Sequence, residues 1–172
     1  NTALGYKALF PNTSSSDNVA IGYRALYSAT NYGWNTAVGK DAMYSTGAVN
    51  ASWNTALGTS ALYSSVSGQS NTAVGYQSLY SSVGGLNSAL GRGAGYFCIG
   101  GWNTAVGSNS GNNNGVNCNN FSAFGYDAGH VGSGTNTIEI GNNNVTYIGG
   151  VVGWSAWSDR RVKDNIQNNV PG

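Results

Sequence analysis

The chain is poor in charge and in proline. Seven of its 172 residues are Lys or Arg and six are Asp or Glu, so charged residues make up 8% of the sequence, and only two residues are Pro. An ordinary domain has roughly 25% charged residues. So few charges, together with 12% aromatic residues, exclude the charge-rich kind of disorder. A formal net charge of +1 gives no basic surface for nucleic acid or an anionic membrane.

Long apolar runs and metal-binding patterns are also missing. No run approaches the roughly 18 apolar residues of a membrane span, so we expect no membrane insertion of this segment. No spacing of His, Cys or Asp suits a metal, and we expect neither metal nor cofactor. The two cysteines, Cys98 and Cys118, are candidates for one disulfide and leave the redox compartment open. Because no signal peptide precedes Asn1, we expect a piece of a longer protein.

What the sequence has in abundance is glycine, 27 residues in all, placed within a repeated phrase. The phrase is Asn-Thr-Ala-(Leu/Val/Ile)-Gly, two variable residues, then (Ala/Ser)-(Leu/Met)-(Tyr/Phe), and the copies degrade toward the C-terminus. Most of its glycines recur every 16 to 19 residues. They are Gly5, Gly22, Gly39, Gly58, Gly75, Gly91, Gly107, Gly125, Gly141 and Gly149.

This period is too short for a propeller blade or a helix pair and suits one turn of a β-solenoid. We therefore predict an all-β fold, a parallel β-roll of about nine turns, called rungs below, over residues 1–150. In each rung we expect Asn-Thr-Ala-Leu to form a first strand, the glycine to turn the chain where a Cβ would clash, and Ala-Leu-Tyr to form a second strand. The Ser-, Asn- and Gly-rich stretch that follows is the expected outer loop.

The first strand is apolar on both faces. Neighbouring side chains of a strand point to opposite faces, yet pairs such as Ala56 and Leu57 are both apolar. Ala fits a narrow interior, and the other face needs an apolar partner, for which two identical chains around a symmetry axis are the economical source. The alternative is a monomer with an exposed strip of Leu and Val, which would exceed the apolar patch usual for a monomer.

These repeats resemble the head repeats of trimeric autotransporter adhesins, on segments such as Asn-Thr-Ala-Val-Gly-Tyr-Gln-Ser-Leu-Tyr-Ser at residues 71–81. The resemblance covers roughly residues 1–150. It implies a left-handed parallel β-roll with three chains per head. The family's common repeat is shorter than the one seen here.

Composition changes sharply near the C-terminus. Charged residues cluster in residues 158–164, after the connector 151–157. The stretch Ser-Asp-Arg-Arg-Val-Lys-Asp-Asn-Ile at 158–166 resembles the start of the intramolecular chaperone domain of phage tailspikes and tail fibres, so 158–172 would begin a short helical or extended C-terminal segment. The resemblance implies self-cleavage between Trp157 and Ser158, with Ser158 as nucleophile and Lys163 as general base. The alternative is a helix cap, with Ser158 as the N-cap residue.

Aromatic residues and asparagines recur at fixed places in the rungs. Trp34, Trp53 and Trp102 each precede the repeat's Asn, and their flat faces among Asn and Ser are candidates for binding glycans. A second aromatic set and the Asn itself are expected to stack as structural ladders along the roll. The aromatic set is Phe10, Tyr27, Tyr44, Tyr63, Tyr80 and Tyr96.

Together these features predict a structural and adhesive segment of an extracellular homotrimeric fibre, from a phage tail fibre or a surface appendage, that attaches to cell-surface glycans. It would lie outside the cell, on a cell surface or a virion tail. Apart from single-turnover self-cleavage, we expect no enzymatic activity. Two alternatives stay open: a self-cleaving tail protein, and the head of a trimeric autotransporter adhesin.

Overall fold

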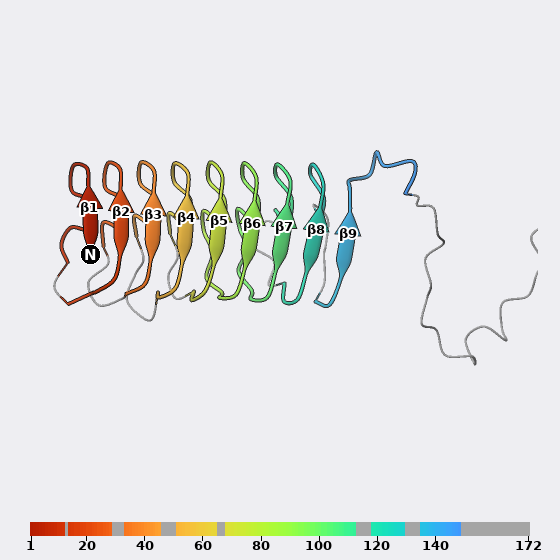
Figure 1. Ribbon diagram of the computed structural model, residues 1–172. Helices are drawn as coiled ribbons and strands as arrows, with labels where there is room; N and C mark the ends of the chain where they lie inside the picture. The colour runs from red at the N-terminus through yellow and green to blue at the C-terminus, as the bar shows by residue number, and fades with distance from the viewer. Residues whose placement is uncertain are drawn as a thin grey trace, which may run out of the picture.

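The computed structural model of the chain shows a parallel β-solenoid built from nine three-residue strands in one sheet (Figure 1). The structure describes residues 1–12, 14–28, 33–45, 51–64, 68–112, 118–129 and 135–148, and it contains no helix within these ranges. The strands are β1 (Thr2–Leu4), β2 (Val19–Ile21), β3 (Thr36–Val38), β4 (Thr55–Leu57), β5 (Thr72–Val74), β6 (Ser88–Leu90), β7 (Thr104–Val106), β8 (Ser122–Phe124) and β9 (Ile138–Ile140).

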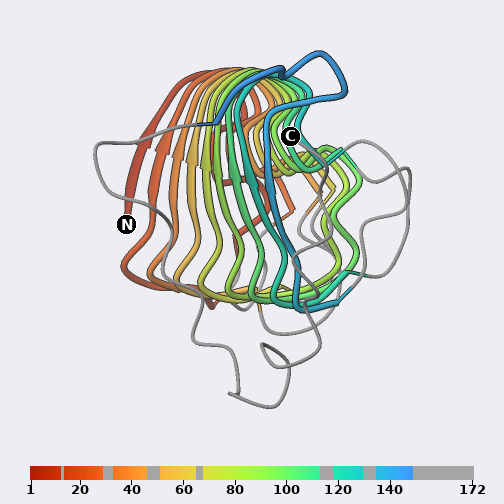
Figure 2. The same ribbon diagram turned by 90° about the vertical axis from the view of Figure 1, so that its right-hand side faces the viewer.

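The strands pair in sequence order and in exact repeat register. Each pairs in parallel with the next, so that Ala37 lies beside Ala56 and Ala56 beside Ala73. Viewed from the C-terminal end, the chain rises along the strands, crosses the top and descends on the far side, turning clockwise as it approaches the viewer (Figure 2). The roll is therefore left-handed, as the resemblance implied.

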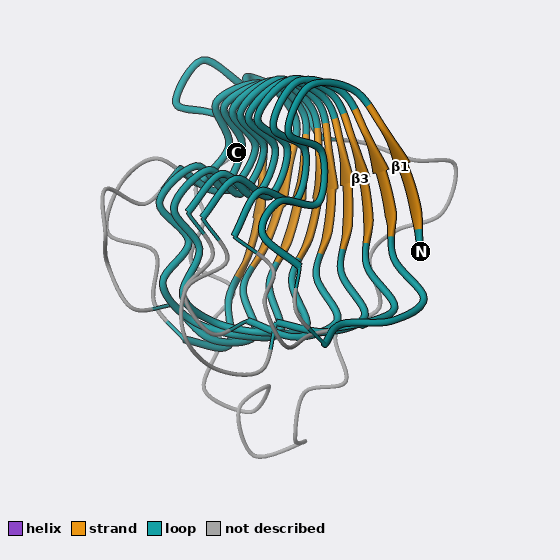
Figure 3. Ribbon diagram, turned by 90° about the vertical axis from the view of Figure 1, so that its left-hand side faces the viewer, coloured by secondary structure: helices purple, strands orange, loops and turns teal. Residues whose placement is uncertain are grey.

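The strands occupy one side of the roll (Figure 3), and their pleat sorts the side chains as predicted. The central Ala points inward and is buried from β2 to β8, whereas the residues on either side of it point outward. In β9 this inward position belongs to Glu139, which is half-buried. A column of small residues lets successive rungs stack around a narrow interior.

The predicted second strand does not form. Residues 8–10 and their equivalents form turns, and the backbone is left-handed at Leu26 (φ 53°) and at Arg24 two residues earlier (φ 52°). A strand would point successive side chains to opposite faces, yet Ala25 and Leu26 are both fully buried. The left-handed residues bend the chain so that both side chains enter the core.

The anchoring glycines have the role that the repeat predicted. Gly22 has φ +133°, and a Cβ on it would lie 2.5 Å from the carbonyl oxygen of Gly39 in the next rung. Neither the conformation nor the close approach suits another residue.

The recurring asparagines form the predicted ladder inside the roll. Asn54 donates its backbone N–H to Oδ1 of Asn35 (2.9 Å), and its own Oδ1 accepts the N–H of Asn71 (2.8 Å). The same bond links every rung from Asn1 to Asn103. At the eighth rung Phe121 replaces Asn, and its N–H still bonds to Asn103 (3.0 Å). The ladder thereby satisfies backbone donors that are buried at the start of each rung.

Toward the C-terminal rungs the large side chains of the core give way to glycine, and the ring of Phe121 fills the space that they leave. The buried Leu or Met of earlier rungs becomes Gly95, Gly111 and Gly129, all with positive φ. The buried ring of Phe121 lies against Gly111 and Gly129. A second cluster, of Cys118, Phe121, Ala123 and Ala128, closes this end of the interior.

Candidate functional site

The three candidate tryptophans lie on the surface, at the corner just before the strands. Trp34 and Trp53 belong to adjacent rungs and stack with ring centroids 5.5 Å apart and planes 9° from parallel. Both are more than half exposed. Trp102 lies three rungs further along and is 64% exposed. The structure thus brings two of the three together and leaves the third in the same column.

All three tryptophans have a left-handed backbone, with φ of 58°, 59° and 59°. Equivalent positions in other rungs carry Asp17, Ser70, Leu86, Asn120 and Asn136, and Asn and Asp tolerate this conformation best. A bulky residue there is costly, and an exposed Trp gains little from burial. Apart from the stack between Trp34 and Trp53, packing within the described chain gives little compensation for this cost, and least for Trp102.

A shallow hollow of about 360 Å³ lies beside Trp102. It is lined by Leu86, Ile99, Trp102, Asn119 and two glycine pairs, 84–85 and 100–101. Glycine is required in its floor, because a Cβ on Gly84 would overlap the backbone of Gly100. An indole face, an amide and open backbone are therefore grouped at one place on the surface.

The second aromatic set forms the ladder that the spacing predicted. Tyr63 and Tyr80 stack at 4.9 Å, and Tyr80 and Tyr96 at 4.7 Å. Burial raises the pKa of the Tyr63 and Tyr80 phenols above the usual value. These rings are only half-exposed, so they stabilise the stack and offer less surface than the tryptophans.

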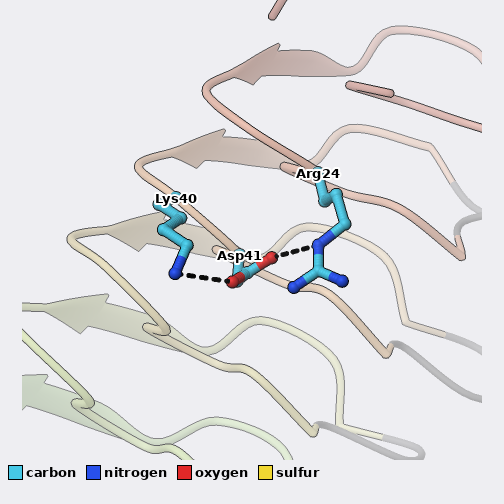
Figure 4. Close-up of polar contacts among 3 residues, drawn as sticks. All are labelled: Arg24, Lys40 and Asp41. Carbon is cyan, nitrogen blue, oxygen red and sulfur yellow. Dashed lines mark hydrogen bonds and ion pairs between the residues drawn. The ribbon is translucent and has the colours of Figure 1, made fainter. Parts of the chain in front are cut away.

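A charged cluster lies at the other end of the strands, after the anchoring glycines (Figure 4). Arg24 donates its Nε–H to Oδ1 of Asp41 (2.7 Å), and Lys40 Nζ lies 3.7 Å from Oδ2 of the same carboxylate. The guanidinium carbon of Arg24 lies 4.9 Å from the ring centre of Tyr23 and 4.6 Å from that of Tyr44. The bond to Asp41 raises the pKa of Arg24 further, so the group stays charged.

Sequence reasoning missed this cluster, although a signal for it existed. Arg24 and Asp41 lie 17 residues apart, which is one period of the repeat, so they occupy the same position in successive rungs. A search for opposite charges one period apart would have paired them. Nothing in the spacing, however, places Arg24 over Tyr44.

The outer face of the sheet is apolar along its whole length. Leu57 is 48% exposed and Leu90 53%. This strip, called the outer apolar strip below, consists of Leu4, Ile21, Val38, Leu57, Val74, Leu90, Val106, Phe124 and Ile140. A row of mainly Thr and Ser runs beside it.

The two cysteines are both buried, and the structure has no disulfide between them. Asn103 Nδ2 lies 3.1 Å from Cys98 Sγ and 2.9 Å from the backbone oxygen of Cys118. Burial raises the pKa of the Cys98 thiol to about 11. The disulfide stays a prediction.

Two further expectations meet different limits. Within the described ranges, no group of three or more His, Cys, Asp or Glu could hold a metal ion, and no helix is long and apolar enough to cross a membrane. Ser158 and Lys163, the cleavage candidates, lie outside the described residues, as do the connector and the C-terminal segment. Self-cleavage stays a prediction from the sequence.

Comparison of the chain with protein-family models, with curated proteins and with solved structures finds no match. The functional argument therefore starts from the surface of the roll: three tryptophans in one column, an aromatic and basic corner, and the outer apolar strip.

Proposed function

We propose that this chain is a structural and adhesive segment of an extracellular homotrimeric fibre, a phage tail fibre or a surface appendage, and that it attaches to glycans. The observation that carries the adhesive part is the placement of Trp34, Trp53 and Trp102. Each is exposed by more than half and has a left-handed backbone. Backbone strain that burial does not compensate is typical of residues at binding sites.

The rigid roll suits this role. Backbone hydrogen bonds tie each rung to the next, such as Thr55 N–H to Asn71 O at 2.8 Å, and the Asn ladder fixes the residue that follows each Trp. Flat aromatic faces on such a scaffold bind sugar rings without a large loss of side-chain entropy. The hollow beside Trp102 adds the amide group of Asn119, whose Oδ1 accepts the N–H of Gly101 (2.9 Å) and whose Nδ2 remains a possible donor to a ligand.

The trimer is supported by the outer apolar strip. It follows the sheet from β1 to β9, and burying it between chains would remove a continuous row of Leu, Val and Ile from water. Threefold packing would give each chain the same partner surface. The adhesin-head alternative predicts the same roll and differs in the segments beyond it.

The adhesive proposal is tested on a glycan array with the wild-type chain and with Trp34→Ala, Trp53→Ala and Trp102→Ala. We expect wild type to bind a subset of glycans and each variant to lose at least about tenfold in affinity, as for the loss of an aromatic anchor. Tyr126→Ala is the matched control, because Tyr126 is 65% exposed and Trp102 64%. Absence of binding by wild type, or equal losses in the control, would overturn the proposal.

A further inference from the structure

The basic residues of the roll are concentrated in its first three rungs. Within the described ranges the Lys and Arg residues are Lys7, Arg24, Lys40 and Arg92, so three of the four lie in these rungs. All three follow the anchoring glycine of their rung by one or two residues, which places them at one corner. In these three rungs the acid at that corner is Asp41, because Asp17 precedes β2 at the strand's opposite end and Asp127 lies in the eighth rung.

The charges at this corner do not balance. Arg24 and Lys40 share the single carboxylate of Asp41. Lys7 occupies the same position as Arg24 one rung earlier, because Arg24 N–H bonds to the oxygen of Tyr6 (2.8 Å). No described carboxylate pairs with Lys7, whose Nζ lies 5.5 Å from the ring centre of Tyr6 and 5.8 Å from that of Phe10. Three cations therefore face one anion.

Arg24 is held ready to bind a second acceptor. Its Nε is occupied by Asp41, and its guanidinium lies over the rings of Tyr23 and Tyr44. The bond to Asp41 ends on Nε and leaves the two terminal nitrogens without a described hydrogen-bond partner (Figure 4), and the side chain is 30% exposed. A guanidinium fixed in this way presents two parallel N–H donors, the geometry that a carboxylate accepts.

Exposed aromatic surface lies beside these donors. Tyr6 and Tyr23 stack with centroids 5.4 Å apart and planes 13° from parallel. Tyr6 is 62% exposed and Tyr23 43%. Phenol rings offer apolar contact to the C–H face of a sugar and hydroxyls to its oxygens.

We propose that Tyr6, Lys7, Tyr23 and Arg24 form a binding site for a carboxylate-bearing sugar, such as a uronic or sialic acid unit of a larger saccharide. The carboxylate accepts the two free N–H groups of Arg24, with Lys7 beside it, and the sugar ring contacts the Tyr6–Tyr23 pair. This site rests on the proposed function only in that its ligand is a saccharide. It lies at the opposite end of the strands from the tryptophans.

The test compares acidic probes with neutral counterparts of the same sugars: trigalacturonic acid with its methyl ester, and sialyllactose with lactose. Titration calorimetry is done on wild type, Arg24→Gln, Lys7→Gln and Arg92→Gln. We expect wild type to bind at least one acid about tenfold tighter than its neutral partner, and Arg24→Gln and Lys7→Gln to remove most of that preference. Arg92→Gln makes the same charge change at the place equivalent to Lys40 three rungs further along the roll, and it should leave that preference intact.

Several outcomes would overturn the proposal: no binding of either acid, equal affinity for acid and neutral partner, or an equal loss in Arg92→Gln. Should Arg24→Gln unfold for want of a partner for Asp41, Lys7→Gln decides, because Lys7 bonds to no described carboxylate. If the tryptophan variants lose binding to neutral glycans and wild type shows no preference for acidic sugars, the proposed function stands and the acidic-sugar site is wrong. If acid binding survives the three tryptophan substitutions, the acidic-sugar site stands and the role of the tryptophans is wrong.

Discussion

Single residues carry an unusual amount of backbone strain in this roll. Among the described residues, twenty other than glycine have positive φ, including Leu26, Met43 and Leu62, where an L-residue loses about 1 kcal/mol or more. For the leucines and the methionine, complete burial of the side chain offsets this cost, at roughly 1.5–3 kcal/mol each. The exposed Trp102 gains no such offset from burial, whereas Trp34 and Trp53 gain from stacking on each other.

We therefore expect Trp102→Asn to stabilise the protein while it removes glycan binding. Asn tolerates a left-handed backbone, and the gain should be about 1 kcal/mol in the free energy of unfolding, measured in urea. Trp53→Asn is the comparison: it also loses the stack on Trp34, worth about 0.5–1.5 kcal/mol, so its net change should be near zero. A large loss of stability in Trp102→Asn would contradict the interpretation of this residue as a binding group.

The raised pKa of Cys98 leads us to expect that the protein becomes less stable at alkaline pH. Burial raises its pKa from 9.0 to about 11, so the unfolded chain releases the thiol proton first as the pH rises. Stability should be constant below about pH 9 and fall between pH 9 and 11, by about 2 to 3 kcal/mol if the shift is about two pKa units. Chemical denaturation across this range measures the fall.

The control for that experiment is Cys98→Ala, which should flatten part of the decline. Tyr63 and Tyr80 also have raised pKa values, and they contribute in the same direction in both proteins. An unchanged alkaline profile in Cys98→Ala would show that Cys98 is not the titrating group.

At the scale of the element, the Asn ladder joins the rungs through buried bonds. We expect Asn54→Ala to cost about 2–4 kcal/mol, because it orphans the N–H of Asn71 and the carbonyl of Gly68, which Asn54 Nδ2 binds at 3.0 Å. Asn71→Ala should cost about 1 kcal/mol less, since Asn71 Nδ2 has no partner among the described residues. Thermal and urea unfolding of both variants measures this difference.

Asn143→Ala provides the control for the ladder variants, because Asn143 is exposed beyond β9 and its loss should change stability by less than about 0.5 kcal/mol. Equal costs for Asn54→Ala and Asn143→Ala would mean that the ladder bonds contribute nothing net.

At the scale of the whole molecule, the outer apolar strip predicts a trimer. Native mass spectrometry and light scattering of wild type should give three times the chain mass. Leu57→Lys with Leu90→Lys should dissociate it, because two charges per chain would enter the apolar contact and unpaired buried charge is costly.

Thr59→Lys is the control for charge alone. Thr59 is exposed, and the equivalent places one rung earlier and two rungs later already hold Lys40 and Arg92. It should leave the mass unchanged. A monodisperse monomer of wild type would show that the strip stays in water.

The arrangement of the whole roll also shows where the uncharged residues of this chain are placed. Alanine lines the interior, asparagine amides are used up inside as a ladder, and threonine and serine form a row beside the outer apolar strip. The few charges of the described rungs are correspondingly informative, since three of the four basic residues lie in the first three rungs.

The sequence by itself determined the solenoid, its register and its inward alanines. A repeat of nearly constant length can pair in parallel only with its neighbours, and strand alternation then assigns Ala to one face and Leu to the other. The glycines and the stacked Tyr and Asn columns follow from the same register, since equal positions fall about 4.8 Å apart.

Only the tertiary structure decided the path of the second half of each rung and the neighbours of Arg24. Ala25 and Leu26 look like strand residues, but burying both requires a left-handed bend, whose cost is offset only when the next rung covers them. Arg24 contacts Tyr44 and Asp41 because the turns after the anchoring glycines direct these three side chains toward one another. Periodicity gives the rung of each residue, while the direction of a side chain depends on the folded backbone.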